Sequence, residues 1–502
     1  MRAQPDFADF EAAYRSGAAQ IVSTTLVADL ETPVSAFLKL ADGRPNSFLF
    51  ESVEGGATIG RYSFLGCKPD LIWRCRDGRA EINRKAHYDL QSFEPLAGPP
   101  LETLRDLVAE SRIDLPDGVP PMASALVGYM GYDMVREMER LPDDNPEVLH
   151  VPEALFLRPS VIAVFDRVED LITVFSPIWP DPELGARAAY DQACERLSNM
   201  VVDFERSLPY RREPVEAAAE LPEPTSNMTR EEFHAMVEAG KEYIFAGDIF
   251  QVVLSQRFSL PFSLPPFSLY RALRRLNPSP FLFFLDLGGF SIVGSSPEVL
   301  VRLRDNEVTI RPLAGTRPRG RNAEEDLRLS EELLADPKER AEHLMLLDLG
   351  RNDVGRVAQV GSVKVTEQFA VEHYSHVMHI VSNVIGQLAE GEDAMSALIA
   401  GFPAGTVSGA PKVRAMEIID ELETDRRSTY AGTVGYFGAG GAMDTCIALR
   451  TALVKDGVIH VQAGGGIVAD SDPEAEYEES RNKARAVIRA AEEAMRFAAQ
   501  RG

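Results

Sequence analysis

Cysteine is scarce in this chain, and the four residues present follow no metal-binding or redox spacing. Structural zinc sites and redox motifs use close pairs such as Cys-x-x-Cys, whereas Cys67, Cys75, Cys194 and Cys446 are scattered. The sequence therefore excludes a disulfide-stapled scaffold and a cysteine-ligated zinc site. We expect four buried thiols, as is usual in a reducing compartment.

Long apolar runs and an excess of positive charge are also lacking. No uninterrupted apolar segment reaches the roughly 20 residues of a membrane-spanning helix, and the N-terminus lacks the basic-then-apolar order of a signal peptide. The 52 basic against 77 acidic residues give a net charge of -25, which disfavours nucleic acid and anionic membranes as partners. We therefore expect a cytoplasmic protein, in which any anion-binding site must be locally positive.

The 502 residues divide at one stretch that lacks apolar periodicity. Residues 205–228 are rich in proline and charge, as is typical of a linker. We predict an N-terminal region over residues 1–204 and a C-terminal region over residues 229–502. Neither region shows a repeat of fixed period.

Short strand-like runs and helical patterns are mixed in both regions. Hairpin-like neighbours around Asp305-Asn306 and around Asp456-Gly457 favour antiparallel pairing. The expected strands include Ser47–Glu51, Leu71–Cys75, Ser160–Phe165, Ile249–Phe258, Phe281–Leu287, Phe290–Gly294, Val299–Arg304, Val308–Leu313, Val434–Phe437, Thr445–Val454 and Val458–Ala463. The predicted fold class is α+β, an α/β sandwich of two largely antiparallel sheets packed together with helices outside.

Two segments combine an Asp-Pro step with a Glu-x-x-Glu spacing. They contain Asp336, Pro337, Glu339 and Glu342 in the first segment, and Asp472, Pro473, Glu476 and Glu479 in the second. Aspartate before proline is a typical helix N-cap, so each glutamate pair belongs to the opening turns of a helix, where positions i and i+3 share a face. The second stripe continues through Lys483 to Val487 and Ala490, so it turns from charged to apolar and should face inward.

Carboxylates removed from water must be paired or bound to a metal. Oxygen ligands from two helices suit Mg²⁺, which tolerates few protein ligands and keeps some waters. We therefore expect Glu342 and Glu479 to be direct ligands of Mg²⁺, with Glu339 and Glu476 beside them. The alternative is that both pairs are solvated acidic first turns, which the helix dipole favours in any protein.

Several donors near these helices suit a dianion, and a dicarboxylate is the natural candidate. Small residues allow close backbone approach at Gly315 and at Gly464–Gly466, although each segment alone could be a turn. The other candidate donors are Thr316, Thr406, Arg450, which we place late in a strand, and Lys483.

Over nearly its whole length, the chain closely resembles the chorismate-utilising enzyme superfamily, and within it the anthranilate synthase component I family. The carriers are Leu313–Thr316, Glu339–His343, Asp348–Asp353, His379, Gly405–Lys412, Gly464–Gly466 and Glu476–Lys483. The resemblance implies that chorismate lies against Mg²⁺ held by the four glutamates. It also implies that Tyr430, Arg450, Gly466 and Lys483 bind the two substrate carboxylates, and that Gly315, Thr316, Thr406 and Gly464 line the same site.

The chemistry of chorismate requires an acid and a proton acceptor. Its ring C4 hydroxyl leaves while a nucleophile adds at C2, so a general acid must lie near that hydroxyl. Glu298 matches the family position of this acid, and a pKa raised by burial would suit it. His379 matches the histidine near the second step, which removes the C2 proton and expels pyruvate. Without the family match, a lone histidine such as His379 is more often structural.

Two positions discriminate between members of the superfamily. Water-adding members place a lysine base where this chain has Gln251, and the aminodeoxychorismate synthase branch commonly carries a lysine nucleophile at the position of Ala314. Both residues therefore indicate direct attack by ammonia. The alternatives are an isochorismate or aminodeoxychorismate synthase, or a non-catalytic regulator that binds tryptophan or chorismate. An acidic calcium-binding protein is disfavoured, because no loop of alternating acidic ligands is present.

The resemblance also implies partners. No cysteine-histidine arrangement of a glutamine amidotransferase occurs in the sequence, so a separate amidotransferase subunit (anthranilate synthase component II) is expected to supply ammonia. Members commonly bind tryptophan as a feedback inhibitor through two segments, and the matching residues here are Glu51, Ser52, Asn277, Pro278 and Phe281. The alternative is that these residues only end a strand and shape a turn.

Overall fold

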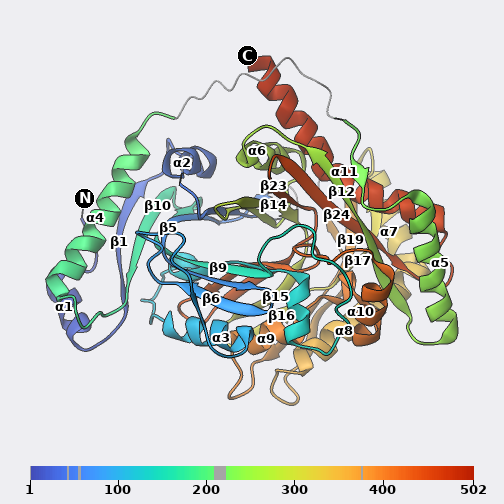
Figure 1. The fold of residues 1–502 in the computed structure, drawn as a ribbon, viewed down its shortest axis with the longest axis horizontal. Coiled ribbons are helices and arrows are strands. Elements are labelled where there is room, and N and C mark those ends of the chain that lie inside the picture. Colours follow the sequence, from blue (N-terminus) through green and yellow to red (C-terminus); the bar gives the residue numbers. More distant parts are fainter. Residues whose placement is uncertain (1, 42–43, 55–57, 209–221, 375–376, 502) are drawn as a thin grey trace.

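The computed structural model describes residues 2–41, 44–54, 58–208, 222–374 and 377–501, and helices surround a large body of strands (Figure 1). The helices are α1 (Phe7–Arg15), α2 (Pro33–Leu40), α3 (Pro100–Glu110), α4 (Ala186–Glu205), α5 (Arg230–Ala246), α6 (Pro266–Leu276), α7 (Ala323–Ala335), α8 (Pro337–Gly355), α9 (Ala394–Gly401), α10 (Lys412–Leu422) and α11 (Pro473–Arg501), with short 3-10 turns at η1 (Pro121–Ala123), η2 (Tyr132–Glu137) and η3 (Gly405–Val407).

The strands carry most of the buried residues. They are β1 (Gln20–Val27), β2 (Ser47–Glu51), β3 (Val53–Glu54), β4 (Thr58–Ile59), β5 (Tyr62–Arg76), β6 (Arg79–Asn83), β7 (Glu94–Pro95), β8 (Ala125–Met130), β9 (Ala154–Asp166), β10 (Leu171–Ile178), β11 (Thr225–Ser226), β12 (Gln251–Pro261), β13 (Phe281–Asp286), β14 (Phe290–Ser296), β15 (Val299–Arg304), β16 (Glu307–Ile310), β17 (Leu313–Pro318), β18 (Lys364–His373), β19 (Val377–Gln387), β20 (Gly409–Ala410), β21 (Thr433–Gly438), β22 (Met443–Ile447), β23 (Thr451–Lys455) and β24 (Val458–Ile467).

The predicted α+β class and the antiparallel pairing are confirmed. Every paired strand in the described ranges runs antiparallel to its neighbour, as in the β12–β24 ladder from Val252–Ile467 to Pro261–Val458. Hydrogen bonds join 22 strands into one continuous network, so the two predicted sheets are connected layers. Bulges in long strands, such as the one in β5 between Pro69 and Leu71, interrupt the ladder and allow such strands to bend.

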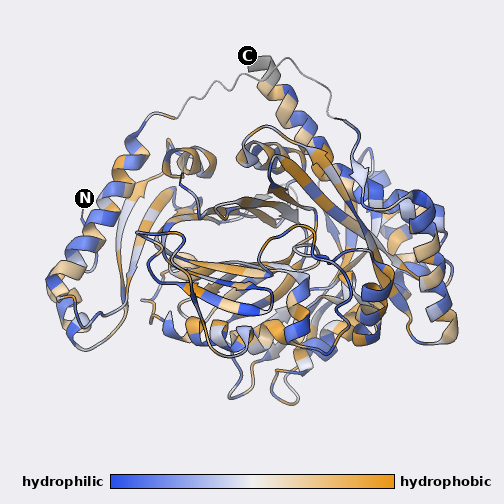
Figure 2. Ribbon diagram, viewed as in Figure 1, coloured by the Kyte–Doolittle hydropathy of each residue, from blue (hydrophilic) through white to orange (hydrophobic). Residues whose placement is uncertain are grey.

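The described part of the hydrophobic core forms three large clusters and a small one of Leu333, Met378 and Ile380. One cluster, which includes Phe48, Tyr129, Phe283, Ile292 and Val434, is drawn from strands and loops and lies between sheet faces. The other two large clusters combine strand residues with helix residues, from α1, α2, α4, α6 and α11 in one and from α3, α5, α8, α9 and α10 in the other. Figure 2 shows the resulting pattern, with hydrophobic residues concentrated on the strands and hydrophilic residues along the outer helices.

The two predicted regions share their sheets. β2 of the N-terminal region pairs with β13 of the C-terminal region, and β8 pairs with β21 in the same way. The predicted linker begins where α4 ends at Glu205, and its last residues form β11 beside β12. Residues 209–221 of that linker lie outside the described residues. The N-terminal region is therefore hydrogen-bonded to the C-terminal region rather than only tethered to it.

Two predicted strands are wrong in extent, because the run Val308–Leu313 divides between β16 and β17 and a second run also divides. The run expected over Thr445–Val454 divides into β22 and β23, and the break contains Arg450 with a φ of 49°. A non-glycine residue with a positive φ interrupts an extended strand, and such positions are often set by the needs of a site.

Three of the four cysteines are buried as predicted, and one is not fully buried. Cys67, Cys75 and Cys446 are buried free thiols, and Cys194 is partly buried. Among the described helices, none combines the length and the apolar character needed to cross a membrane.

Candidate active site

The two predicted helix starts are confirmed. The Asp336 carboxylate accepts hydrogen bonds from the backbone amides of Lys338 and Glu339, and α8 begins at Pro337. Asp472 accepts from the Ala475 amide at 2.9 Å in the same way at the start of α11. Both caps leave the glutamates in the first turns of their helices, as the spacing predicts.

The four glutamates lie close enough to repel one another. Burial raises the pKa of Glu342, and the nearby charges of Glu339 and Glu479 raise it further. Burial likewise raises the pKa of Glu476, with a further contribution from Glu479. Carboxylates from α8 and α11 therefore converge on one region, although the Glu479 side chain remains 50% exposed, so the predicted inward-facing stripe of α11 is only partly buried at its charged end.

Basic groups and a hydroxyl offset part of this negative charge. Arg317 Nη1 lies 2.9 Å from Glu339 Oε1, and Lys483 Nζ lies 2.7 Å from Glu479 Oε1. Ser471 donates to Glu476 at 2.7 Å. Within the described ranges, no group of three or more histidine, cysteine, aspartate or glutamate side chains is arranged to hold a metal by itself. This donor set fits an ion that takes one or two protein carboxylates and completes its shell with water and substrate, as Mg²⁺ does.

The glycine run 464–466 is a strand segment, not a turn. It lies within β24, opposite Val253–Ser255 of β12. A Cβ atom on Gly465 would lie 2.6 Å from Glu476 Oε2 and 3.4 Å from Glu479 Oε1. The absence of a side chain at Gly465 therefore leaves room for the carboxylates of α11 against this glycine segment. Lys483 Nζ donates to the Gly464 carbonyl at 2.9 Å, so the glycine segment also positions this cation.

Tyr430 lies against the same glycine segment. The residue is buried, and burial raises its pKa to about 12 while a hydrogen bond with the Gly464 backbone opposes that shift. The hydroxyl therefore stays protonated near neutral pH and can donate to an anion beside Gly464.

Gly315 forms the opposite wall. It adopts a φ of 75° at an irregularity in the β17–β19 pairing between Ala314 and Thr316. A Cβ atom there would lie 3.1 Å from Glu339 Oε2. The bulge leaves the Gly315 carbonyl 3.0 Å from His379 Nδ1, and Thr316 Oγ1 lies 3.1 Å from the same nitrogen.

These contacts determine the state of His379. A carbonyl oxygen only accepts hydrogen bonds, so Nδ1 carries the hydrogen and Nε2 carries the lone pair. Burial lowers the pKa of His379 to about 4, with a smaller contribution from Arg450. The imidazole is therefore neutral at physiological pH. Its Nε2 is buried and has no hydrogen-bond partner among the described residues.

Glu298 has the environment predicted for an acid. The side chain is 5% exposed, at the turn between β14 and β15. Burial raises its pKa to about 8, although Thr406, the Leu313 backbone and Arg450 oppose the shift. Thr406 Oγ1 lies in η3 and forms no hydrogen bond of ordinary geometry with any described residue. Glu298 is therefore protonated at neutral pH and available as a proton donor.

Arg450 is a partly buried cation without a counter-ion. It lies in the break between β22 and β23, and burial lowers its pKa, while the nearby Tyr374 and Glu298 oppose that shift. Within the described ranges no ion pair or hydrogen bond engages its guanidinium. A group of this kind is stable only where an anion completes its surroundings.

Gln251 lies between Glu342 of α8 and the glycine segment of β24. It begins β12, and its Nε2 lies 3.5 Å from Glu342 Oε1, at the limit of a hydrogen bond. A Cβ atom on Gly466 would lie 2.1 Å from that nitrogen, so this glycine makes room for the amide. Gln251 Oε1 is a third buried polar atom that lacks a partner in the described structure, after His379 Nε2 and Thr406 Oγ1.

One supporting residue was missed by sequence reasoning. Arg427 is 2% exposed and forms two hydrogen bonds with Glu423, at 2.9 and 2.6 Å. Its other donors reach the carbonyls of Val407 at 2.7 Å and Val253 at 2.6 Å, and its guanidinium lies 5.4 Å from the Tyr430 ring centroid. Arg427 therefore links η3 to β12 and packs beside the Tyr430 ring. No local motif marks it, because two of the groups that it links, the carbonyls of Val407 and Val253, are distant in sequence.

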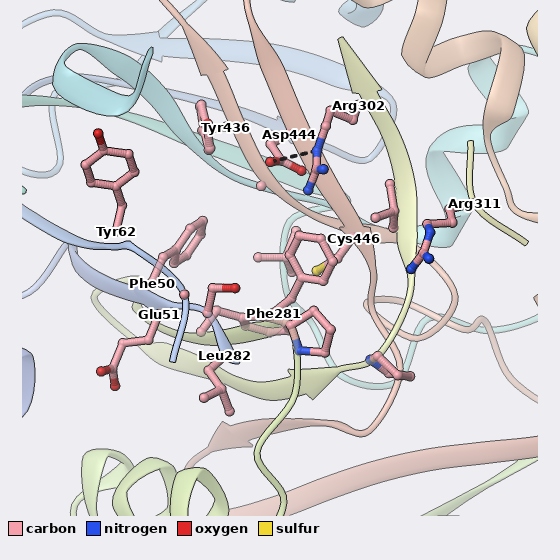
Figure 3. A pocket seen from close by; sticks show the side chains of 18 of the residues that line it. Phe50, Glu51, Tyr62, Phe281, Leu282, Arg302, Arg311, Tyr436, Asp444 and Cys446 are labelled. Carbon is pink, nitrogen blue, oxygen red and sulfur yellow. Dashed lines mark hydrogen bonds and ion pairs between the residues drawn. The ribbon is translucent and has the colours of Figure 1, made fainter. Parts of the chain in front are cut away.

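A second feature is a cavity of about 620 Å³, which we call the sandwich cavity. Figure 3 shows its aromatic side chains, among them Phe50, Phe281 and Tyr436, and the ion pair of Arg302 with Asp444 at 3.1 Å. Asp444 Oδ1 and the Tyr436 hydroxyl are buried without hydrogen-bond partners in the described residues. The cavity therefore combines aromatic walls with polar atoms that are free to bind a ligand.

Three of the five residues predicted to bind tryptophan line this cavity, namely Glu51, Ser52 and Phe281. Asn277 and Pro278 are not among its lining residues; they follow α6 and lead into β13. The carboxylate of Glu51 points away from Arg302 and Asp444 (Figure 3). It is held by Tyr270 at 2.7 Å, and also by Arg167 and Arg274. Other lining residues, which the sequence did not single out, are Val434, Gly435, Tyr436, Asp444 and Cys446.

Comparison with known proteins agrees with this geometry. The chain belongs to the chorismate binding enzyme family, whose model matches residues 63–489 and so spans both predicted regions. At a finer level, the chain is 60% identical to an anthranilate synthase component 1 from Cereibacter sphaeroides, over 99% of each chain.

Solved structures give the same result. The crystal structure of anthranilate synthase component I from Streptococcus pneumoniae is 34% identical, with a TM-score of 0.75, and the match covers 92% of this chain and 98% of that chain. The menaquinone-specific isochorismate synthase of Escherichia coli shares the fold, with a TM-score of 0.69 over 96% of this chain and 99% of that chain, but only 20% identity.

Proposed function

We propose that the chain is the large subunit of an anthranilate synthase, which converts chorismate and ammonia to anthranilate and pyruvate. The observation that carries the proposal is one set of groups around one site: a protonated buried acid, a neutral histidine with a free Nε2, an unpaired arginine and converging carboxylates. A protein that only bound a ligand would have no need for an acid and a base of matched protonation. The relatives named anthranilate synthase component 1 support the same reaction.

The first step needs a proton at the leaving hydroxyl. Glu298 is protonated below about pH 8 and donates its proton to the ring C4 oxygen of chorismate, which leaves as water while ammonia adds at C2. Thr406 lies beside Glu298, and its free hydroxyl can orient the acid or the departing oxygen. Arg450, Tyr430 and Lys483 hold the carboxylates of the substrate meanwhile.

The second step removes the C2 proton and releases pyruvate, which leaves an aromatic ring. His379 Nε2 is positioned to accept or orient that proton, because its Nδ1 hydrogen is committed to the Gly315 carbonyl. The low pKa of His379 keeps this nitrogen free of a proton at every pH above about 5.

Glu342 and Glu479 are proposed to hold Mg²⁺, with Glu339 and Glu476 supporting them. Burial raises the pKa values of Glu342 and Glu476, and neighbouring glutamates raise them further, which supports a cation-binding role for this group of carboxylates. When bound, the ion would neutralise this repulsion and polarise a substrate carboxylate. The substrate itself would complete the coordination shell.

The choice of nucleophile follows from two side chains. Gln251 offers an amide where activation of water needs a base, and Ala314 is buried and offers no amine to attack the ring. Ammonia therefore attacks directly, and the product is anthranilate rather than isochorismate or aminodeoxychorismate.

Ammonia is proposed to come from glutamine through a separate amidotransferase subunit. The described cysteines do not resemble an amidotransferase nucleophile, which must ionise readily. Burial instead raises the pKa of Cys67 to about 11, and it raises the pKa of Cys75, Cys446 and Cys194 as well. The "component 1" in the names of the relatives supports a second component.

The sandwich cavity is proposed to bind tryptophan as a feedback inhibitor. Its volume of about 620 Å³ and its aromatic walls suit an indole ring. Its free Asp444 oxygen suits an N–H donor, and its arginines suit a carboxylate. Ser52, beside Glu51, contributes a hydroxyl to the same wall.

The proposal is tested by incubating the purified chain with chorismate, Mg²⁺ and ammonium and identifying the product. Fluorescent anthranilate supports it, while isochorismate or aminodeoxychorismate would assign the chain to a sister reaction. Addition of tryptophan should suppress the signal, and a chelator should abolish it.

A further inference from the structure

Three hydrogen-bonded residues, Arg311, Glu372 and Tyr374, lie between the sandwich cavity and His379, and we call them the wall. Arg311, Glu372 and Tyr374 line the cavity on this side. Tyr374 also lies against His379, with ring centroids 5.4 Å apart and the ring planes at 68°. The side chains that an occupant of the cavity would meet are therefore one residue away from the imidazole.

The wall is held together by a short chain of hydrogen bonds that uses both oxygens of Glu372. Arg311 Nη2 donates to Glu372 Oε1 at 2.5 Å, and the Tyr374 hydroxyl donates to Glu372 Oε2 at 3.0 Å. Arg311 also reaches Glu367 at 3.1 Å. Burial alone would raise the pKa of Glu372, but the bond and charge of Arg311 hold it below its usual value. Glu372 is therefore an ionised link between a cationic cavity residue and Tyr374.

The other end of the chain reaches the reacting groups. Glu372 lies opposite His379 in the β18–β19 ladder, and Tyr374 joins their side chains, because its hydroxyl bonds Glu372 and its ring packs on the imidazole. The imidazole of His379 is fixed at Nδ1 by Gly315 and Thr316, and the Tyr374 ring meets its side. A shift of Tyr374 would tilt the imidazole about its Nδ1 bond and move Nε2, the nitrogen that handles the proton.

We propose that Tyr374 is a positioning residue for His379, and that Arg311, Glu372 and Tyr374 couple occupancy of the sandwich cavity to the orientation of that imidazole. The inference rests on the proposed function. An amino acid in the cavity carries a carboxylate that competes with Glu372 for Arg311. Release of Glu372 loosens its hold on the Tyr374 hydroxyl, so the inhibitor acts on the proton-transfer group and not only on the shape of the site.

The consequence is reciprocal. Coupling between two ligands changes the affinity of each by the same factor. Chorismate, which needs the ordered imidazole, should weaken tryptophan binding to the same extent that tryptophan weakens chorismate binding. The ratio of tryptophan Kd values with and without chorismate therefore reports the coupling without turnover, if ammonia is omitted.

The test is Tyr374→Phe, which keeps the ring against His379 and removes only the bond to Glu372. Tyr243→Phe is the matched control, because the hydroxyl of Tyr243 on α5 donates to the Glu421 carboxylate on α10 at 2.7 Å, and neither residue lines the cavity. Glu372→Gln is a second variant, which keeps the shape of the side chain and removes its charge. Melting temperature is compared for all four proteins.

We expect Tyr374→Phe to lower kcat by about tenfold, a part of the usual effect of a proton-transfer group, with the KM for chorismate within about twofold. We expect the ratio of tryptophan Kd values to fall towards one in both wall variants and to stay at the wild-type value in Tyr243→Phe. A Tyr374→Phe protein with wild-type kcat, or with the wild-type ratio, would overturn the inference. A wild-type protein that made no anthranilate would instead refute the proposed function.

Discussion

The Nδ1 hydrogen of His379 is committed to the carbonyl oxygen of Gly315, 3.0 Å away. This contact exists because Gly315, with a positive φ, bulges out of the β17–β19 ladder and turns its carbonyl towards the imidazole. The bond fixes the tautomer and leaves Nε2 as the basic nitrogen. Backbone geometry at one glycine thus prepares a side chain for proton transfer.

The pH dependence of kcat should reflect Glu298. Its pKa is raised to about 8 by burial, and the protonated form is the active acid. The rate should therefore fall by about tenfold per pH unit above about pH 8. The pKa of His379, lowered to about 4, places no second transition between pH 5 and 8. The measurement is kcat from pH 5 to 9.5, with ammonia concentration corrected for its own protonation.

Glu298→Gln provides the control for this profile. It should lower kcat by a factor on the order of 10² to 10⁴ and remove the alkaline transition. The effect of this substitution on folding stability at high pH is opposite to its effect on kcat. A carboxyl whose pKa is raised by folding loses stability as pH rises from its unfolded value to its folded value. The variant should therefore melt at a higher temperature than the wild type at pH 9. An alkaline transition that persists in Glu298→Gln would assign it to another group.

Loss of either proposed metal ligand should abolish turnover. Glu342→Gln and Glu479→Gln keep the shape of the side chain but remove a charge that Mg²⁺ requires. Anthranilate formation is measured against Mg²⁺ concentration, with Glu478→Gln as the control, because Glu478 lies beside Glu479 on α11 and, among the described residues, forms an ion pair with Arg481. Near-normal activity in either ligand variant would refute the metal assignment.

Ser52→Ala should relax feedback inhibition while leaving catalysis intact. Ser52 lines the sandwich cavity, and removing its hydroxyl costs a ligand roughly 0.5–1.5 kcal/mol for one hydrogen bond. The tryptophan concentration for half inhibition should therefore rise by roughly twofold to tenfold. Ser259→Ala, which removes a hydroxyl bonded to His460, is a matched change outside the cavity. Unchanged sensitivity to tryptophan in Ser52→Ala would argue against the regulatory site.

Arg427→Met should destabilise the protein and weaken catalysis together. Removing one partner of a buried ion pair costs about 3–5 kcal/mol, because Glu423 is left as an unpaired buried charge. Arg481→Met removes an exposed pair with Glu478 and should cost less than about 1 kcal/mol. Urea unfolding measures both values. A loss for Arg427→Met no larger than that for Arg481→Met would show that the buried pair does not support the site.

The sequence predicted the parts of this molecule that depend on local rules. The Asp336 and Asp472 caps and the antiparallel class were expected, and the structure confirms them. The convergence of the glutamates was also predicted, because each pair lies on one helical face.

The remainder depends on contacts between distant segments. Gly464–Gly466 looks like a turn in sequence but is a strand, because the close approach of α11 requires glycine there. Arg450 lies in a break between strands, which no local pattern marks. Arg427 and Tyr374 were missed, because their importance comes from partners far along the chain or on another strand. Burial is also what raises the pKa of Glu298, and it cannot be read from a motif.

The most direct measurement is the product that the purified chain forms from chorismate, Mg²⁺ and ammonium, followed by fluorescence and identified by mass. We predict anthranilate and pyruvate in equal amounts, and we expect both to be lost when Mg²⁺ is chelated or when Glu342 is changed to Gln. Formation of isochorismate or aminodeoxychorismate, or anthranilate formation that survives the removal of Mg²⁺, would contradict this prediction.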